Sequence, residues 1–201
     1  TAQPTNPAPI CVGGIVNVSV TASLNGGSGT LSYQWQSSAD GTSGWANVTD
    51  GTGATTDSYT SGALSSNTFY RSIITSSTTN CTITSNVVQA TVVSDPAISV
   101  QPIGGIVCNG GTYNLSVTAT GGTPSLNYQW FSSADNVSFT LISGATSNTY
   151  TTPALTANTY YRVDVSATGN GCGLVTSNSV LVTVIPDPVV TTQPIGNTIC
   201  S

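Results

Sequence analysis

The feature that most constrains the fold of this chain is an internal repeat of somewhat under one hundred residues. The segments QPTNPAPIC, QPIGGIVC and QPIGNTIC begin 98 and then 92 residues apart, at Gln3, Gln101 and Gln193. Between them, VNVSVTA matches YNLSVTA, LSYQWQSSADG matches LNYQWFSSADN, and TFYRSI matches TYYRVD. Repetition on this scale indicates a tandem array of small domains. We therefore predict two complete modules, residues 1–95 and 96–188, and the first residues of a third, residues 189–201.

Each module has the pattern of short β-strands. In VNVSVTA, the apolar residues Val16, Val18 and Val20 alternate with polar ones, which is the period of a strand with one buried face. Turn-forming segments such as NGGSG, ADGTSG and TGGTP recur about every ten residues, the spacing of all-β sandwiches and barrels. No segment of useful length has helical periodicity, so we predict an all-β protein.

The charged residues limit the functions that the chain can have. Its 201 residues include two arginines and seven aspartates, a net charge of -5, with no lysine, glutamate or histidine. Two cations cannot form the basic surface that nucleic acids or anionic membranes require, and no stretch is apolar enough for membrane insertion. The usual catalytic triads, zinc sites and Schiff bases cannot be assembled from this set. We therefore predict no enzyme activity and no cofactor.

Calcium is the metal that the composition leaves open. The segments SADGTSG and SDPA offer hard oxygen ligands, but each supplies one aspartate, whereas a calcium site usually needs several acidic oxygens. Asp40 and Asp135 lie in equivalent turns, and Asp95 and Asp187 in equivalent linkers, which favours structural roles. We predict no metal site.

The order of the motifs along each repeat carries a family resemblance. A tryptophan in YQW, a YYR or FYR strand about thirty residues later and a final apolar strand resemble an immunoglobulin-type (Ig-like) sandwich. The order Cys, Gly-rich turn, VSVTA, YQWxSSADG, YYRV, Cys, TSNxVxxTV is similar to the Ig-like repeats of large secreted adhesins of gliding bacteria, exported by type IX secretion. The resemblance implies two tandem Ig-like β-sandwich modules plus the start of a third, in an extracellular surface protein.

The cysteines differ from those of antibody-like domains, whose disulfide joins the second and sixth strands across the core. Here Cys11 and Cys108 precede the second strand, and Cys81 and Cys172 follow the sixth. We predict bonds Cys11–Cys81 and Cys108–Cys172, one in each module, with free buried thiols as the alternative. Cys200 aligns with Cys11 and Cys108, so we expect it to be unpaired within this chain, with its partner in a following module.

Four side chains are candidate ligand contacts. Arg71 and Arg162 occupy the same position of the sixth strand, where each could bind an acidic sugar or a partner's carboxylate. Trp45 and Phe139 follow the SSAD turn, where an exposed ring could stack on a sugar. The alternative is structural for both pairs: the arginine stem covers its neighbours and its head pairs locally, for instance with Asp164, and the rings cap the core edge.

These observations favour a non-enzymatic segment of a long extracellular adhesin or filament. We expect the segment to act as a disulfide-clamped stalk in surface attachment and gliding motility, as part of a longer or processed chain. The expected partners are neighbouring modules of the same chain, other strings packed laterally into fibres, and surface glycans. The alternatives are carbohydrate-binding Ig-like modules appended to a secreted protein, and a self-assembling filament subunit.

Overall fold

The computed structural model describes residues 2–24 and 28–196, and all of its regular elements are β-strands. The strands of the first repeat are β1 (Ile10–Cys11), β2 (Asn17–Ser19), β3 (Leu31–Ser38), β4 (Ala46–Asn47), β5 (Ser58–Thr60), β6 (Thr68–Ser76), β7 (Thr82–Thr84), β8 (Val88–Ala90) and β9 (Val92–Val93). Those that follow are β10 (Ala97–Val100), β11 (Gly105–Cys108), β12 (Asn114–Ser116), β13 (Thr118–Thr120), β14 (Asn127–Ser133), β15 (Thr140–Leu141), β16 (Thr149–Thr151), β17 (Thr159–Ser166), β18 (Leu174–Thr176) and β19 (Val180–Ile185).

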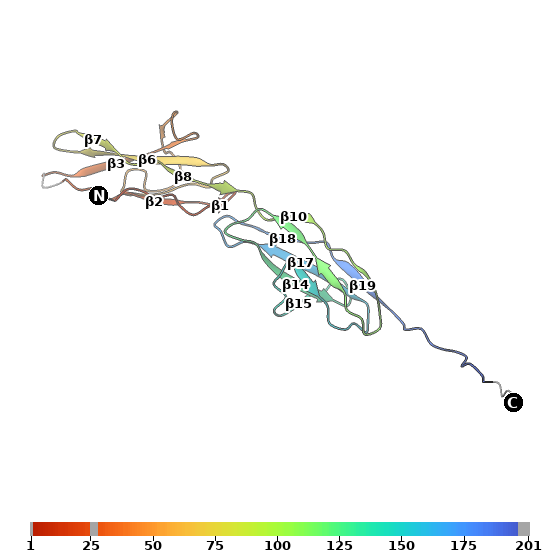
Figure 1. Ribbon diagram of the computed structural model, residues 1–201. Coiled ribbons are helices and arrows are strands. Elements are labelled where there is room, and N and C mark those ends of the chain that lie inside the picture. The colour runs from red at the N-terminus through yellow and green to blue at the C-terminus, as the bar shows by residue number, and fades with distance from the viewer. Residues whose placement is uncertain (1, 25–27, 197–201) are drawn as a thin grey trace. The chain divides into compact units, whose positions relative to one another are not determined.

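The first repeat folds as two facing sheets (Figure 1). The larger one has the order β4-β3-β6-β7, with β8 also paired to β6, and the smaller one pairs β2 with β5 antiparallel. A short parallel pair, β1 with β9, brings Cys11 opposite Val93. The edge strand β1 therefore ends beside the last strand of the repeat, which places Cys11 at the exit of the chain from this sandwich.

The second repeat reproduces this topology. Its larger sheet has the order β11-β19-β17-β14-β15, with β18 paired to β17, and its smaller sheet pairs β12 with β16. The strand β11 pairs parallel with β19 and brings Cys108 opposite Ile185, as Cys11 lies opposite Val93. The prediction of an all-β, tandem Ig-like architecture is confirmed.

The core of each sandwich is built around one tryptophan. Trp35 is fully buried and its ring packs on Tyr59, with ring centroids 6.3 Å apart. The indole N–H donates to the carbonyl oxygen of Thr56 at 2.9 Å, so the polar atom of the ring is satisfied inside the core. Trp130 and Tyr150 repeat the stack at 6.1 Å. In antibody domains the buried tryptophan packs against the disulfide between the sheets, whereas here it packs on a tyrosine.

Residue contacts divide the chain into two compact units. The first contains residues 1–100, 118–128 and 164–176, and the second contains residues 101–117, 129–163 and 177–201. The first unit thus includes segments from both sequence repeats, among them the loop that carries Cys172. The module boundaries expected at residues 95 and 188 stay a prediction.

Candidate functional site

The cysteine pairing is the most informative feature of the first unit. Cys11, at the end of β1, forms a disulfide with Cys172, in the loop between β17 and β18, with the two Cα atoms 4.8 Å apart. Cys11 is fully buried. The bond joins positions 161 residues apart, so it links one sequence repeat to the other.

The predicted bonds Cys11–Cys81 and Cys108–Cys172 are wrong, because the two cysteines of one repeat lie at opposite ends of its sandwich. Cys11 lies opposite Val93, beyond the Thr68 end of β6, whereas Cys81 follows the other end of that strand. A nine-residue strand spans roughly 30 Å, and a disulfide requires Cα atoms within about 7 Å. Cys81 and Cys108 are exposed free thiols, and Cys200 lies outside the described residues.

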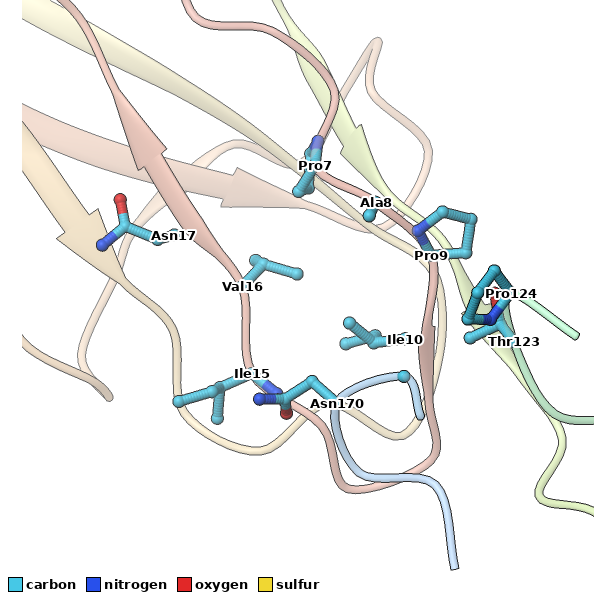
Figure 2. Close-up of a pocket in the computed structure, with 11 residues that line it drawn as sticks. Pro7, Ala8, Pro9, Ile10, Ile15, Val16, Asn17, Thr123, Pro124 and Asn170 are labelled. Atoms are coloured by element: carbon cyan, nitrogen blue, oxygen red, sulfur yellow. The ribbon is translucent and has the colours of Figure 1, made fainter. Parts of the chain in front are cut away.

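The loop that carries Cys172 is also held by hydrogen bonds. The backbone N–H of Cys11 donates to the carbonyl oxygen of Asn170 at 2.9 Å, and the N–H of Ile15 donates to the Asn170 side-chain oxygen at 2.8 Å. Figure 2 shows Asn170 beside Ile15, and Thr123 and Pro124 beside Pro9, around a hollow of about 320 Å³. Asn170 therefore ties the loop that carries Cys172 to Cys11 and to Ile15.

A second set of contacts involves residues just after β9. The carbonyl oxygen of Ser94 accepts a hydrogen bond from the N–H of Gly122 at 2.8 Å. The carboxylate of Asp95 accepts a longer one, 3.4 Å, from the N–H of Gly173. Gly121 has a φ of 77°, and a β-carbon there would overlap the carbonyl oxygen of Asp95. The glycines therefore permit a close backbone approach that larger residues would prevent.

The arginine and aromatic candidates come together in pairs. The guanidinium of Arg71 lies over the Trp45 ring, 4.2 Å from its centroid, and Arg162 lies over Phe139 at 4.3 Å. These are cation–π distances. Arg71 also donates from Nε and Nη2 to the side-chain oxygen of Gln36, at 3.0 and 2.9 Å. Each arginine is therefore engaged with its own repeat, which favours the structural interpretation.

The two arginine clusters differ at one position. Phe131 occupies the place of Gln36 in the second repeat, and its ring centroid lies 5.4 Å from the Arg162 guanidinium. The Nε atom of Arg162 is consequently buried without a hydrogen-bond partner. The predicted partner Asp164 instead accepts a hydrogen bond from the Thr176 hydroxyl at 2.7 Å.

The aspartates of the SSAD turns are structural. The Oδ1 atom of Asp40 accepts hydrogen bonds from the backbone N–H groups of Thr42 and Ser43, and the Ser43 hydroxyl donates to Oδ2. These bonds hold the pKa of Asp40 well below its usual range. In the second repeat, backbone hydrogen bonds from Ser138 and Val137 lower the pKa of Asp135 to about 2. The carboxylates therefore close the turns that lead into β4 and β15.

The described residues contain no cluster of three or more histidine, cysteine, aspartate or glutamate side chains that could hold a metal. Within residues 2–24 and 28–196 no helix is long and apolar enough to span a bilayer. Within the described residues, the cysteines are therefore the candidate functional groups.

Comparison with known proteins gives a family. A family model described as Domain of unknown function (DUF8696) matches residues 4–94 and, a second time, residues 103–186. The chain belongs to this family. The two matches follow the two sequence repeats, so one DUF8696 domain corresponds to one repeat. The family description says nothing of gliding adhesins or type IX secretion, and no curated protein matches the chain in sequence.

Solved structures similar to this DUF8696 chain are tandem Ig-domain proteins. The three N-terminal domains of the outer capsid protein Hoc of bacteriophage RB49 are 13% identical, with a TM-score of 0.60 over 92% of this chain and 68% of that one. Titin domains I67–I69 are also 13% identical, with a TM-score of 0.55 over 96% and 67%. At these identities the likeness shows the fold alone. Domains 3–5 of Drosophila OTK are 19% identical at a TM-score of 0.45, and the chain spans 60% of their length.

Sequence reasoning missed the inter-repeat disulfide, although the order of the strands gives a signal against a bond within one repeat. In an Ig-like sandwich the second and sixth strands run in the same direction. A cysteine before the second strand and a cysteine after the sixth therefore lie at opposite ends of the sandwich. The cysteines of one repeat therefore could not meet, which left either free thiols or a bond to another repeat.

Proposed function

We propose that this chain is a non-enzymatic stalk segment of a long extracellular adhesin or filament. Tandem Ig-like domains are typical of adhesion and structural proteins and usually carry no catalytic site, and the arginines and aspartates considered as functional groups have local structural partners. The observation that carries the proposal is the Cys11–Cys172 bond, which covalently joins two successive repeats. In a stalk under tension, force passes through this covalent bond and the residues between the two cysteines are not pulled apart.

The same bond supports a location outside the cytosol. Disulfides persist in oxidising compartments and are rare where glutathione and thioredoxin keep thiols reduced. Attachment to surfaces, gliding motility and lateral packing into fibres belong to this proposal through the family resemblance of the repeats. The partners are further repeats of the same kind.

Single-molecule stretching of the full chain, tethered at its two ends, tests the stalk proposal. Under oxidising conditions the 161-residue interval between the bonded cysteines should release none of its length, because tension passes through the disulfide. After reduction, both repeats should unfold and add roughly 550 Å, at about 3.4 Å per residue.

The matched control is the double variant Cys11→Ala with Cys172→Ala, which should extend fully without reductant. Release of the full length by the oxidised parent chain would contradict the proposal, since the bond would then carry no load.

A further inference from the structure

The two free cysteines occupy the same local structures as the two bonded ones. Each repeat has one arginine at the same position of its sixth strand. Cys81 is the tenth residue after Arg71, and Cys172 is the tenth residue after Arg162. Each follows a residue with left-handed backbone, Asn80 with a φ of 53° and Gly171 with a φ of 79°. Cys81 therefore has the backbone setting of a cysteine that is bonded in this same structure.

Cys108 corresponds to Cys11 in the same way. Each ends an edge strand that pairs parallel with the last strand of its repeat. Each is followed by the same turn, in which the carbonyl oxygen of the cysteine accepts a hydrogen bond from the glycine three residues later, at 3.0 Å for Gly14 and 2.9 Å for Gly111. The half-site that Cys11 provides to Cys172 is thus preformed at Cys108.

We propose that Cys81 and Cys108 are each half of a disulfide to a further repeat of this type. Cys108 would bond to the cysteine equivalent to Cys172 in a following repeat, and Cys81 to the cysteine equivalent to Cys11 in a preceding one. The inference rests on the proposed function only in requiring that further repeats exist. The observation that supports this pairing is the Cys11–Cys172 bond, which joins the equivalent positions within this chain.

The surface beside Cys108 matches the surface that accompanies Cys11. A hollow of about 300 Å³ there is lined by Asn109, Ile185, Pro186 and Asp187, among others. By alignment of the repeats, Pro186 and Asp187 stand where Ser94 and Asp95 accept hydrogen bonds from Gly122 and Gly173. In the second unit the corresponding positions remain exposed, with Ile185 43% accessible.

The surface beside Cys81 matches the receiving side. A groove of about 470 Å³ is lined by Leu24, Leu31, Ile74, Ile83 and Cys81, among others, and Ile83 is 61% exposed. Leu126 is the counterpart of Leu31 in the second repeat, and it lies against Gly122 together with Pro96, a residue of the segment that leaves the first repeat. The groove therefore fits the exit segment of a preceding repeat.

The bond-forming step is an ordinary thiol–disulfide exchange. Cys108 and the cysteine of the next repeat together give up two protons and two electrons, and a disulfide oxidant accepts them and leaves as two thiols. The first thiolate forms a mixed disulfide with the oxidant, and the second thiolate displaces the oxidant from it.

Because Cys108 lies within the loop closed by Cys11 and Cys172, successive loops would overlap and each repeat would lie inside a covalent loop.

Crosslinking between two copies of the full chain tests the inference. Both copies carry Cys200→Ser, one also carries Cys81→Ser and the other Cys108→Ser, so each offers one of the two half-sites. The copies are mixed at about millimolar concentration, the effective concentration that a short linker provides, in a buffer of oxidised and reduced glutathione. Non-reducing electrophoresis and mass spectrometry of the linked peptides then identify the bonds.

We expect a mixed dimer joined from Cys81 to Cys108, in at least ten-fold excess over the homodimers that either variant forms alone. Equal yields of homodimer, or no dimer while the Cys11–Cys172 bond forms completely, would overturn the inference. The stretching experiment on the parent chain reads only the Cys11–Cys172 bond, so failure of the stalk proposal and failure of this inference are distinguishable.

Discussion

At the scale of single residues, one difference between the repeats changes the contacts of the equivalent arginines. Arg71 has an aromatic ring beneath it and an amide oxygen beside it, whereas Arg162 has two aromatic rings and no acceptor for its Nε atom. The substitution of Phe131 for Gln36 accounts for the difference. The sequence indicated that both arginines occupy the same position of the sixth strand, but not which neighbours their guanidinium groups reach, because that depends on cross-strand register.

A double-mutant cycle measures the worth of the Arg71–Gln36 contact. We expect Gln36→Leu and Arg71→Met to be coupled by about 1.5–3 kcal/mol in the free energy of unfolding, the range for hydrogen bonds to a charged group. The matched cycle in the second repeat, Phe131→Leu with Arg162→Met, should show a coupling below about 1 kcal/mol. Urea denaturation provides both values, and equal couplings would show that the amide contact contributes little.

At the scale of elements, the alternating sequence pattern predicted the strands well because one face of each sheet is buried. Val18 on β2 and Leu115 on β12 are buried between exposed neighbours, as the period of two requires. The SSAD turns were also readable, since aspartate commonly closes a turn through its own backbone. The parallel pairing of β1 with β9 was not, because two-residue edge strands leave no periodic signal.

The turn aspartates and core tyrosines set the pH range over which the fold is stable. Folding lowers the pKa of Asp135 to about 2, so its stabilising contribution is present above about pH 4 and is lost as the pH falls toward 2. Burial raises the pKa of Tyr70 and of Tyr161 to about 12, so their contribution is present below about pH 10 and is lost as the pH rises toward 12.

We therefore expect the free energy of unfolding to be constant between about pH 5 and 9 and to fall outside that range. Chemical denaturation from pH 2 to 11 measures this profile. The double variant Asp40→Asn with Asp135→Asn should have a flatter acid limb, and a sharp unfolding step near neutral pH would mean that other groups control stability.

At the scale of the whole molecule, the disulfide changes how the repeats depend on each other. A bond across 161 residues closes a long loop in the unfolded chain, and the chain-entropy model assigns such a loop about 5 kcal/mol. That value is large beside the stability of a small domain, about 5–15 kcal/mol. Measured effects are commonly smaller than the model gives, because the reduced chain retains some structure.

We expect Cys11→Ala with Cys172→Ala to lower the free energy of unfolding by about 2–5 kcal/mol. The matched control, Cys81→Ala with Cys108→Ala, removes two exposed thiols and should change it by less than about 0.5 kcal/mol. Urea unfolding under non-reducing conditions compares the two variants with the parent chain. An equal loss in both would show that the bond contributes no more than the exposed thiols do.

The sequence alone determined the repeat, because segments far apart in it match one another. It also determined the all-β class and the Ig-like resemblance, because these depend on local patterns: alternating apolar residues, turn residues and the tryptophan in YQW. Only the tertiary structure decided which cysteines bond, because that depends on which segments far apart in the chain lie together, as Cys11 and Cys172 do in the first unit. It also decided the partners of the arginines, which depend on register between neighbouring strands. Local pattern encodes the strands and their faces, whereas contacts between segments far apart in the chain arise only when the strands are assembled in space.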